Sequence, residues 1–383
     1  MPAKRPGKPS GLEGIIALQS SICEVDGERG KLYYRGIELH ELATQSTYEE
    51  TAYLLWNGQL PDRAELQALE AEMFPDRDLP CQVPEMIDDY MTSWDSMEAL
   101  RTSISALSGC DHDGLNHARD QDLTRAILLT ARTPVIVATY HRARKKLPPL
   151  RPSPDLGTAA NFLYMLRGEV SDERHARILD TVLIVHADHE LNASTFAARV
   201  AASTLADIYA AVTSAIGTLD GPLHGGANED VMHMLEEIGS PDRAEQYVMN
   251  LLAQGKKVPG FGHRVYKTAD PRATELRPYA EELAKEAGET RFFDISKKLE
   301  EVMMREKGLN ANLDFISAMV YHGLGIPTDL MTPLFACSRM AGWTAHILEQ
   351  YSDNRLIRPR AEYVGPRNVH YVPIERRQAK SAA

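Results

Sequence analysis

The sequence has few cysteines, and they are not spaced as a disulfide framework or a zinc site would require. Its 383 residues contain four, Cys23, Cys81, Cys110 and Cys337, and no C-x-x-C pair. Scattered cysteines of this kind are typical of reduced thiols in a cytosolic protein. We therefore expect a cytoplasmic location and no structural metal.

Long apolar runs and an excess of positive charge are also absent. No apolar stretch reaches the roughly 20 residues that a membrane-spanning helix needs. Residues 1–10 are basic and proline-rich but have no apolar core, so we expect a mobile tail rather than a signal peptide. The net charge of −12 argues against general binding to nucleic acid or to an anionic membrane.

Helical patterns fill almost the whole chain. The single β-like segment is 12–36, where turns at Asp26-Gly27 and Arg29-Gly30 separate short runs. Those runs are Ile15–Leu18, Ser21–Val25 and Lys31–Tyr34. Strands and helices do not alternate and no fixed-period repeat appears, which argues against a Rossmann core, an α/β barrel and a solenoid. We predict an all-α protein with a small N-terminal β-ribbon.

Capping residues and apolar spacing locate the helices. Ser46 to Glu49 form a predicted capping box, and Gly58 should end the helix that follows. Asn192 should cap a helix that runs to about Ile216, with Gly217 as its stop. That segment is rich in Ala, Ser and Thr, so we expect it to be buried in the protein's centre or in a subunit interface. Other helices are expected near 84–92, 96–108, 118–145, 155–167, 171–187, 227–238, 241–254, 290–307, 312–322 and 331–351, with 353–383 irregular.

A glycine-framed histidine stands between two of these helices. Residues 221–228 read Gly-Pro-Leu-His-Gly-Gly-Ala-Asn and place His224 among three glycines, which let a ligand approach the main chain. The next helix begins near Ala227, and its N-terminal dipole should disfavour a positive charge on the ring. We interpret His224 as a neutral hydrogen-bond donor to an oxyanion. A helical corner with a packed histidine is the alternative.

A second glycine-rich loop carries His263 directly after Gly260-Phe261-Gly262. Four basic residues surround it in an otherwise acidic protein. These are Lys256, Lys257, Arg264 and Lys267. A solvated surface would explain the cluster, whereas a functional interpretation is a phosphate-rich ligand held by the cations and by glycine N–H groups.

A dense polar run, His186–Asn192, lies between two apolar helices. We interpret His189 as a hydrogen-bond donor to a ligand carboxylate or carbonyl. His186, Asp188 and His189 could instead be the ligands of a metal-dependent hydrolase. No further carboxylate cluster completes a coordination shell, which disfavours that alternative.

The remaining candidates are one carboxylate and three arginines. Asn312 can cap a helix and so place Asp314 in an apolar first turn, either as an acid favoured by the helix dipole or as a base facing a pocket. Arg339 is surrounded by small and apolar residues and therefore needs an anionic partner. Together with Arg272 and Arg358 it is a candidate carboxylate clamp.

These motifs carry a resemblance to the citrate synthase family. The stretch Gly260–Arg272 resembles the family's signature, Gly221–Asn228 resembles its other histidine turn, and Asn312-Leu313-Asp314 resembles its catalytic aspartate. The similarity extends from about Leu12 to Arg360 in the same order and spacing. The chain length is similar to the compact form of archaea and many bacteria.

The resemblance implies a homodimer of two-domain helical subunits. The large domain would combine 1–224 with 326–383, and the small domain would be 225–325. The cleft between them would close on oxaloacetate and then accept acetyl-CoA as a co-substrate, with no permanently bound cofactor and no metal.

The resemblance also implies residue roles. Asp314 would remove a methyl proton from acetyl-CoA, His224 would donate to the thioester oxygen, and His263 would polarise and protonate the oxaloacetate carbonyl. The residues expected to hold oxaloacetate are His189, Arg272, Arg339 and, from the other subunit, Arg358. The residues expected at CoA are Lys256, Lys257, Val258, Gly260, Gly262, Arg264, Lys267 and Asn312.

The implied activity is that of citrate synthase, an acyltransferase at the entry to the tricarboxylic acid cycle. One alternative is 2-methylcitrate synthase, which would use propionyl-CoA with the same fold and catalytic residues. The stretch Arg264-Val265-Tyr266-Lys267 looks more like the citrate enzyme. A non-catalytic helical scaffold or sensor is disfavoured because Asp314 and both histidines are present.

Overall fold

The computed structural model describes residues 11–12, 14–80, 82–111 and 113–377. The tail expected at 1–10, and Cys81, lie outside these ranges. Within them the chain forms sixteen α-helices and one small sheet, so the predicted all-α fold with a β-ribbon is confirmed. No helix in the described ranges is both long and apolar enough to cross a membrane.

The helices follow the predicted order. In the first half they are α1 (Leu39–Gln45), α2 (Tyr48–Asn57), α3 (Arg63–Met73), α4 (Gln82–Met86), α5 (Ser96–Leu107), α6 (Arg119–Arg144), α7 (Thr158–Arg167) and α8 (Glu173–His186). In the second half they are α9 (Ala193–Ala202), α10 (Ile208–Leu219), α11 (Ala227–Ile238), α12 (Pro241–Ala253), α13 (Pro271–Glu286), α14 (Arg291–Lys307), α15 (Leu313–Gly323) and α16 (Met331–Ser352).

The β-ribbon contains three antiparallel strands, β1 (Cys23–Asp26), β2 (Lys31–Tyr34) and β3 (Ile37–Glu38), in the order β1-β2-β3. Tyr34 pairs with Cys23 on one side and with Ile37 on the other. The predicted run Ile15–Leu18 forms no strand. Both edges of β2 are already occupied, and Ile16 is 89% exposed.

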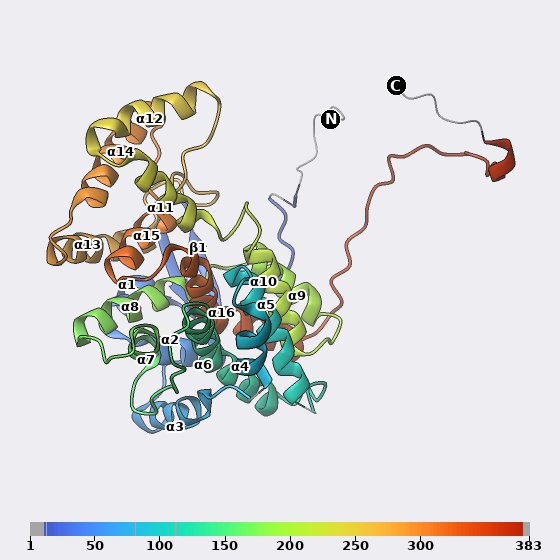
Figure 1. Cartoon of the computed structure of the whole chain (residues 1–383). Helices are drawn as coiled ribbons and strands as arrows, with labels where there is room; N and C mark the ends of the chain where they lie inside the picture. The colour runs from blue at the N-terminus through green and yellow to red at the C-terminus, as the bar shows by residue number, and fades with distance from the viewer. Residues whose placement is uncertain (1–10, 13, 81, 112, 378–383) are drawn as a thin grey trace.

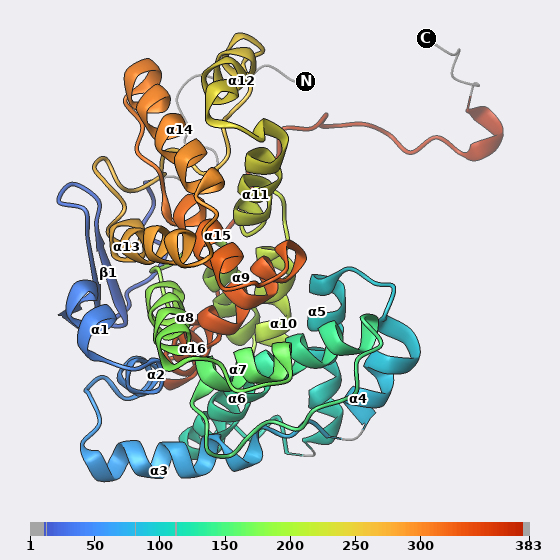
Figure 2. The same cartoon turned by 60° about the vertical axis from the view of Figure 1, so that its left-hand side comes forward.

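Helix α16 is the centre of the molecule. Almost all of its residues are buried, and it packs against α2, α6, α8, α9 and α10. A helix that is apolar on every face is stable only when other elements surround it. Helices α11 to α15 gather at the opposite end of the molecule from α3 and α6, and α13 packs against α1 and α8 (Figures 1 and 2). The segment that follows α16 leaves the body as an extended chain (Figure 1).

Two predicted boundaries are wrong. The segment from Ala193 to Ile216 is two helices rather than one, because Asp207 caps a new helix by accepting from the N–H of Ala210 at 2.8 Å. Gly217 therefore lies inside α10 and stops nothing. The capping box is one residue later than predicted, formed by Thr47 and Glu50.

The caps that position the functional residues are as predicted. The Asn192 side chain accepts from the N–H groups of Ser194 and Thr195 at the start of α9. The Asn312 side chain accepts from the N–H of Phe315 at the start of α15. These caps fix the chain directly after His189 and directly before Asp314.

Candidate active site

One cavity of about 380 Å³ brings together residues from six separated stretches of the chain. All three predicted catalytic residues and three of the four predicted carboxylate-binding residues line it. They are His189, His224, His263, Arg272, Asp314 and Arg339. The elements that supply them are the α8–α9 turn, the α10–α11 turn, the loop before α13, and the helices α13, α15 and α16.

The turn with His224 depends on a close backbone approach. The N–H of Gly225 donates to the carbonyl of Leu219 at 2.8 Å. A Cβ at Gly225 would lie 2.4 Å from that carbonyl oxygen, so only glycine fits. The prediction that glycines at this turn permit a special backbone arrangement holds at Gly225.

The His224 ring is held by residues from distant elements. Its Nε2 lies 2.8 Å from the hydroxyl of Ser194 and 3.3 Å from the Ser194 N–H. The Ser194 hydroxyl also accepts from Trp343 Nε1 at 3.1 Å. Because the backbone N–H points at Nε2, that nitrogen is an acceptor, and the neutral ring carries its proton on Nδ1.

The His224 ring is neutral at pH 7, as predicted, but for a partly different reason. Burial, with a smaller contribution from Arg339, lowers the pKa of His224 to about 4. The helix whose terminal N–H reaches the ring is α9, through Ser194, rather than α11.

The His263 ring is held by its own loop. Its Nδ1 accepts from the backbone N–H groups of Val265 at 3.0 Å and of Tyr266 at 3.1 Å. These two contacts are shorter than the 3.4 Å between Arg272 Nη2 and Nε2, so they identify Nδ1 as the acceptor and leave the proton of the neutral ring on Nε2. Burial and the nearby Arg272 lower the pKa of His263 to about 4. The loop thus presents an uncharged N–H donor.

Asp314 is a carboxylate of unusual basicity. It lies in the first turn of α15 and lines the cavity. Burial raises the pKa of Asp314 to about 6, although Arg272 and Arg339 oppose the shift. A carboxylate with this pKa is largely ionised at pH 7 and is a stronger base than an exposed one.

Arg272 is buried and fixed by Asp270, a carboxylate that was not among the predicted site residues. Asp270 accepts from Arg272 Nε at 3.0 Å and from Arg272 Nη2 at 2.8 Å. Asp270 also accepts from the N–H of Leu313, at the start of α15. The sequence does contain a pattern for this ion pair, since an acidic residue two positions before a first-turn arginine can form it.

His189 and Arg339 complete the floor of the cavity. The His189 Nε2 lies 3.1 Å from the Tyr266 hydroxyl, and burial lowers the pKa of His189 well below its usual value. Arg339 is 1% exposed, and its Nε donates to the carbonyl of His186 at 2.6 Å. Its guanidinium stacks 4.7 Å above the ring of Phe335. The structure therefore confirms that Arg339 is buried.

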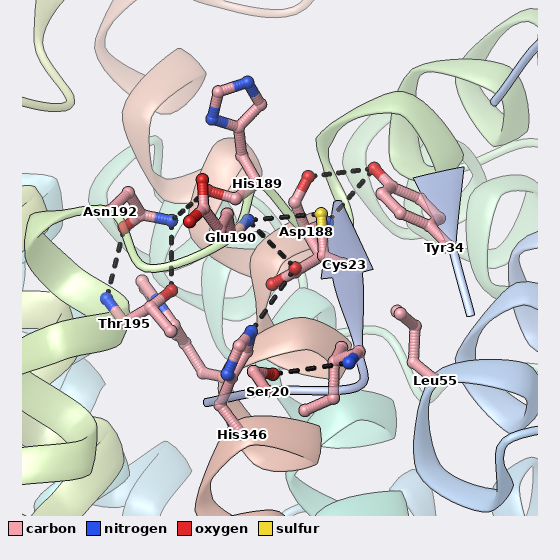
Figure 3. Close-up of polar contacts among 12 residues, drawn as sticks. Ser20, Cys23, Tyr34, Leu55, Asp188, His189, Glu190, Asn192, Thr195 and His346 are labelled. Carbon is pink, nitrogen blue, oxygen red and sulfur yellow. Dashed lines mark hydrogen bonds and ion pairs between the residues drawn. The ribbon is translucent and has the colours of Figure 1, made fainter. Parts of the chain in front are cut away.

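The alternative metal site does not form. His186 Nδ1 donates to the carbonyl of Val182, whereas Asp188 faces His346 at 3.4 Å. His189 points away from Asp188 (Figure 3). Among the described residues, no three His, Cys, Asp or Glu side chains are grouped so that they could hold a metal ion.

The residues predicted at CoA surround the cavity in different ways. Arg264 lines it, and Gly262, Lys267 and Asn312 line an adjoining cavity of about 120 Å³. Lys256 and Lys257 are exposed after α12, while Val258 and Gly260 are buried. Lys267 forms an ion pair with Glu28.

The fourth predicted clamp, Arg358, is not brought to the cavity. It is exposed on the extended segment that follows α16. Two residues that orient His224 were not predicted. They are Ser194, which contacts the ring, and Trp343, which donates to Ser194. No local pattern links them to His224, because the contacts join α9, α16 and the α10–α11 turn.

The chain is similar to proteins of one family along almost its full length. A family model described as "Citrate synthase, C-terminal domain" matches residues 11–360. Over 368 residues the chain is 46% identical to citrate synthase 2 of Bacillus subtilis (strain 168), covering 96% of this chain and 98% of the relative. A 2-methylcitrate synthase of Shewanella oneidensis is 38% identical over 371 residues, covering 96% and 98%.

The fold is also similar to solved structures of citrate synthases. The crystal structure of citrate synthase from Thermotoga maritima superimposes with a TM-score of 0.87 at 43% identity, covering 97% of this chain and 99% of the other. A citrate synthase from Thermoplasma acidophilum, in a ternary complex with carboxymethyl coenzyme A and oxaloacetate, superimposes with a TM-score of 0.92 at 34% identity, covering 96% of this chain and 98% of the other.

Proposed function

The chain belongs to the citrate synthase family, and we propose that it carries out the family's reaction with Asp314, His224 and His263. The protein is an acyltransferase that condenses acetyl-CoA with oxaloacetate and hydrolyses citryl-CoA to citrate and CoA. One observation carries the residue roles. A carboxylate with a raised pKa, two neutral histidines and two buried arginines face one cavity.

The first step is removal of a methyl proton from acetyl-CoA. The Asp314 carboxylate accepts the proton, while the Nδ1–H of His224 donates to the thioester oxygen as charge develops there. A neutral donor matches this need, because a thioester methyl is a very weak acid and a carboxylate alone is a modest base.

The second step joins the two substrates. The enol carbon attacks the oxaloacetate carbonyl, and the Nε2–H of His263 donates to the carbonyl oxygen and protonates it. Water then cleaves the thioester of citryl-CoA, which releases citrate and the CoA thiol. Arg272, Arg339 and His189 hold the oxaloacetate carboxylates and carbonyl during these steps.

CoA binding is proposed at the basic loop. The exposed Lys256, Lys257 and Arg264 are placed to meet phosphates, and Gly262, Lys267 and Asn312 lie beside the adjoining cavity. Val258 and Gly260 are buried parts of the same loop. Acetyl-CoA is a co-substrate here, and we propose no permanently bound cofactor.

We propose that the chain acts as a homodimer of two-domain subunits in the cytoplasm. Residues 225–325 would be the small domain, and the cleft would close over the substrates. Arg358 would enter the partner's cavity, an assignment supported by its exposed position on the extended segment.

Mixed dimers of Arg358→Ala and His224→Ala subunits should then regain activity at about half the sites or fewer. Inactive heterodimers would contradict this.

The test of the function is release of the CoA thiol in the presence of oxaloacetate. We expect rapid release with acetyl-CoA and slower release with propionyl-CoA, since one methylene in a pocket changes selectivity by about 10–200-fold. Faster release with propionyl-CoA would identify a 2-methylcitrate synthase. No release with either thioester would reject the proposed function.

A further inference from the structure

Asp188 is a buried carboxylate to which the reaction steps give no role. It lies in the α8–α9 turn, directly before His189, and is 0% exposed. Its Oδ2 accepts from the N–H of Glu190 at 3.1 Å and lies 3.4 Å from His346 Nε2. Its Oδ1 is buried without a hydrogen-bond partner among the described residues (Figure 3). A buried anion of this kind needs a nearby cation.

The carboxylate packs against the face of α16 that carries Arg339. Gly342 lies one helical turn after Arg339, and a Cβ at Gly342 would be 2.5 Å from Asp188 Oδ1. The same Cβ would be 2.2 Å from the carbonyl oxygen of Ala187. The glycine therefore allows the α8–α9 turn to lie directly on the helix, beside Arg339.

The neighbouring His346 faces Asp188 through its Nε2. Arg199 Nη1 lies 3.2 Å from His346 Nδ1, and a guanidinium can only donate, so Nδ1 is an acceptor. The His346 proton is therefore on Nε2, which faces Asp188. The charge of Arg199 is matched by Glu349 at 2.5 Å. Arg339 is a buried cation near Asp188, because its Nε donates to the carbonyl of His186, which lies two residues earlier in the chain.

The electrostatics agree with this geometry. Burial raises the pKa of Asp188, yet His346 and Arg339 hold the net value below the usual range. Burial lowers the pKa of Arg339, and Asp188 is the first charge that opposes this. Each group thus stabilises the charged form of the other.

We propose that Asp188 is a positioning residue of the oxaloacetate site, whose charge balances Arg339 and whose hydrogen bond to Glu190 holds the turn that carries His189. The proposal rests on the proposed function, because it assigns Arg339 a substrate carboxylate.

Glu190 has φ +53°, a conformation that non-glycine residues rarely adopt, and the Asp188 contact holds it. An incoming dicarboxylate shares Arg339 with Asp188, so Asp188 weakens binding of the substrate and of the tricarboxylate product.

The decisive variant is Asp188→Asn, which keeps the shape and the oxygen facing Glu190 but removes the charge. By calorimetry without acetyl-CoA, we expect the dissociation constant of oxaloacetate to fall about three- to tenfold. Inhibition by citrate should strengthen by a similar factor. A residue that only maintained the fold would weaken binding when altered. An unchanged or larger dissociation constant would overturn the proposal.

Asp180→Asn is the matched control. Asp180, which lies in α8, is also a buried aspartate, but its charged partner is Arg177 at 2.8 Å. This variant should leave the dissociation constant of oxaloacetate unchanged. An equal effect in both variants would show that any loss of buried negative charge suffices, and would reject a specific role for Asp188.

A double-mutant cycle tests the charge pair without substrate. Asp188→Asn should lower the thermal midpoint of the free protein, and the loss should shrink in an Arg339→Gln background, because both buried charges are then absent. If Asp188→Asn alone does not fold, the double variant should. Equal losses in both backgrounds, or no folding in either, would overturn the proposal. Wild type that binds no oxaloacetate would instead reject the proposed function, and the cycle would still decide the pairing.

Discussion

The two glycine-rich turns hold their histidines by opposite means. The His263 ring accepts two N–H groups of its own loop, from Val265 and Tyr266. The His224 ring contacts Ser194, which is 30 residues away in the sequence and is itself held by Trp343 of α16. One ring is oriented locally, and the other depends on the packing of distant helices.

The difference explains how two similar turns can serve two carbonyls. Donation to Nδ1 of His263 leaves its proton on Nε2, whereas donation to Nε2 of His224 leaves its proton on Nδ1. Each turn therefore presents a neutral N–H donor, but through a different ring atom. The fold uses backbone amides in one case and the start of α9 in the other.

The largest predicted effect separates the chemical duties of the two turns. His224→Ala and Asp314→Asn should each lower turnover by about 10²–10⁴-fold, the usual range for general acid–base groups. Both should also abolish exchange of the acetyl-CoA methyl protons with deuterated solvent, measured by mass spectrometry with an unreactive oxaloacetate analogue bound. His263→Ala should lose condensation to a similar extent but keep the exchange.

The control for these variants is their folded state. Circular dichroism and the thermal midpoint should remain close to those of the wild type. If His263→Ala also lost methyl-proton exchange, the division of labour between the two turns would be rejected. Near-normal turnover in Asp314→Asn would remove its assignment as the base.

The next effect concerns stability, because the glycines of the two turns meet different constraints. A methyl at Gly225 would meet a carbonyl at 2.4 Å, whereas Gly262 has φ +79° and its nearest contact would be 3.5 Å. We expect Gly225→Ala to cost about 1–3 kcal/mol of unfolding free energy and Gly262→Ala about 1 kcal/mol. Urea denaturation measures both.

Gly226→Ala is the matched control for this pair. A Cβ there would meet nothing within 4 Å, and its φ of −76° suits any residue. Its unfolding free energy should match that of the wild type. A loss as large as that of Gly225→Ala would mean that flexibility, rather than the approach to Leu219, explains the glycine.

Much of this site could be predicted from the sequence, because its chemistry lies in short local motifs. The histidine turns and the cap at Asn312 each depend on neighbouring residues. The helix break at Asp207 was missed, since the Ala, Ser and Thr content favoured one long helix and the cap was overlooked. Caps compete with helix propensity, and here the cap determines the boundary.

What the sequence could not supply is contact between distant elements. Ser194 reads as an ordinary first-turn serine, and Asp188 as one polar residue among several. Only the tertiary structure shows that Asp188 packs against Gly342 of α16. Such contacts depend on tertiary packing, which no local pattern specifies.

A smaller loss of kcat should follow from removing the Ser194 hydroxyl that contacts His224. Ser194→Ala removes the hydroxyl at 2.8 Å but leaves the backbone N–H, so the ring keeps one of its two contacts. A hydrogen bond of about 1.4 kcal/mol corresponds to about a tenfold loss of kcat. Steady-state kinetics should show this loss with little change in the KM of oxaloacetate. A raised KM with normal kcat would instead place Ser194 at the oxaloacetate side.

The pH dependence of kcat distinguishes Asp314, the proposed base, from the two histidine rings. The pKa of Asp314 is raised to about 6, and those of His224 and His263 are lowered to about 4. Asp314 must be ionised to accept a proton, so kcat should fall about tenfold between pH 7 and pH 5 while both rings stay largely neutral. The logarithm of kcat should fall more steeply as the pH decreases and approach a slope of one near pH 5.

The same three pKa shifts have opposite effects on the stability of the folded protein. Both rings bind protons more weakly in the folded protein, so they reduce its stability as the pH falls from about 6.5 toward 4. Asp314 binds its proton more tightly when folded, so protonation of this group favours the native state. The loss of kcat near pH 6 should therefore be reversible and precede any loss of fluorescence-detected structure. A slope greater than one between pH 6 and pH 5 would show that a second group, such as one of the two rings, titrates together with Asp314.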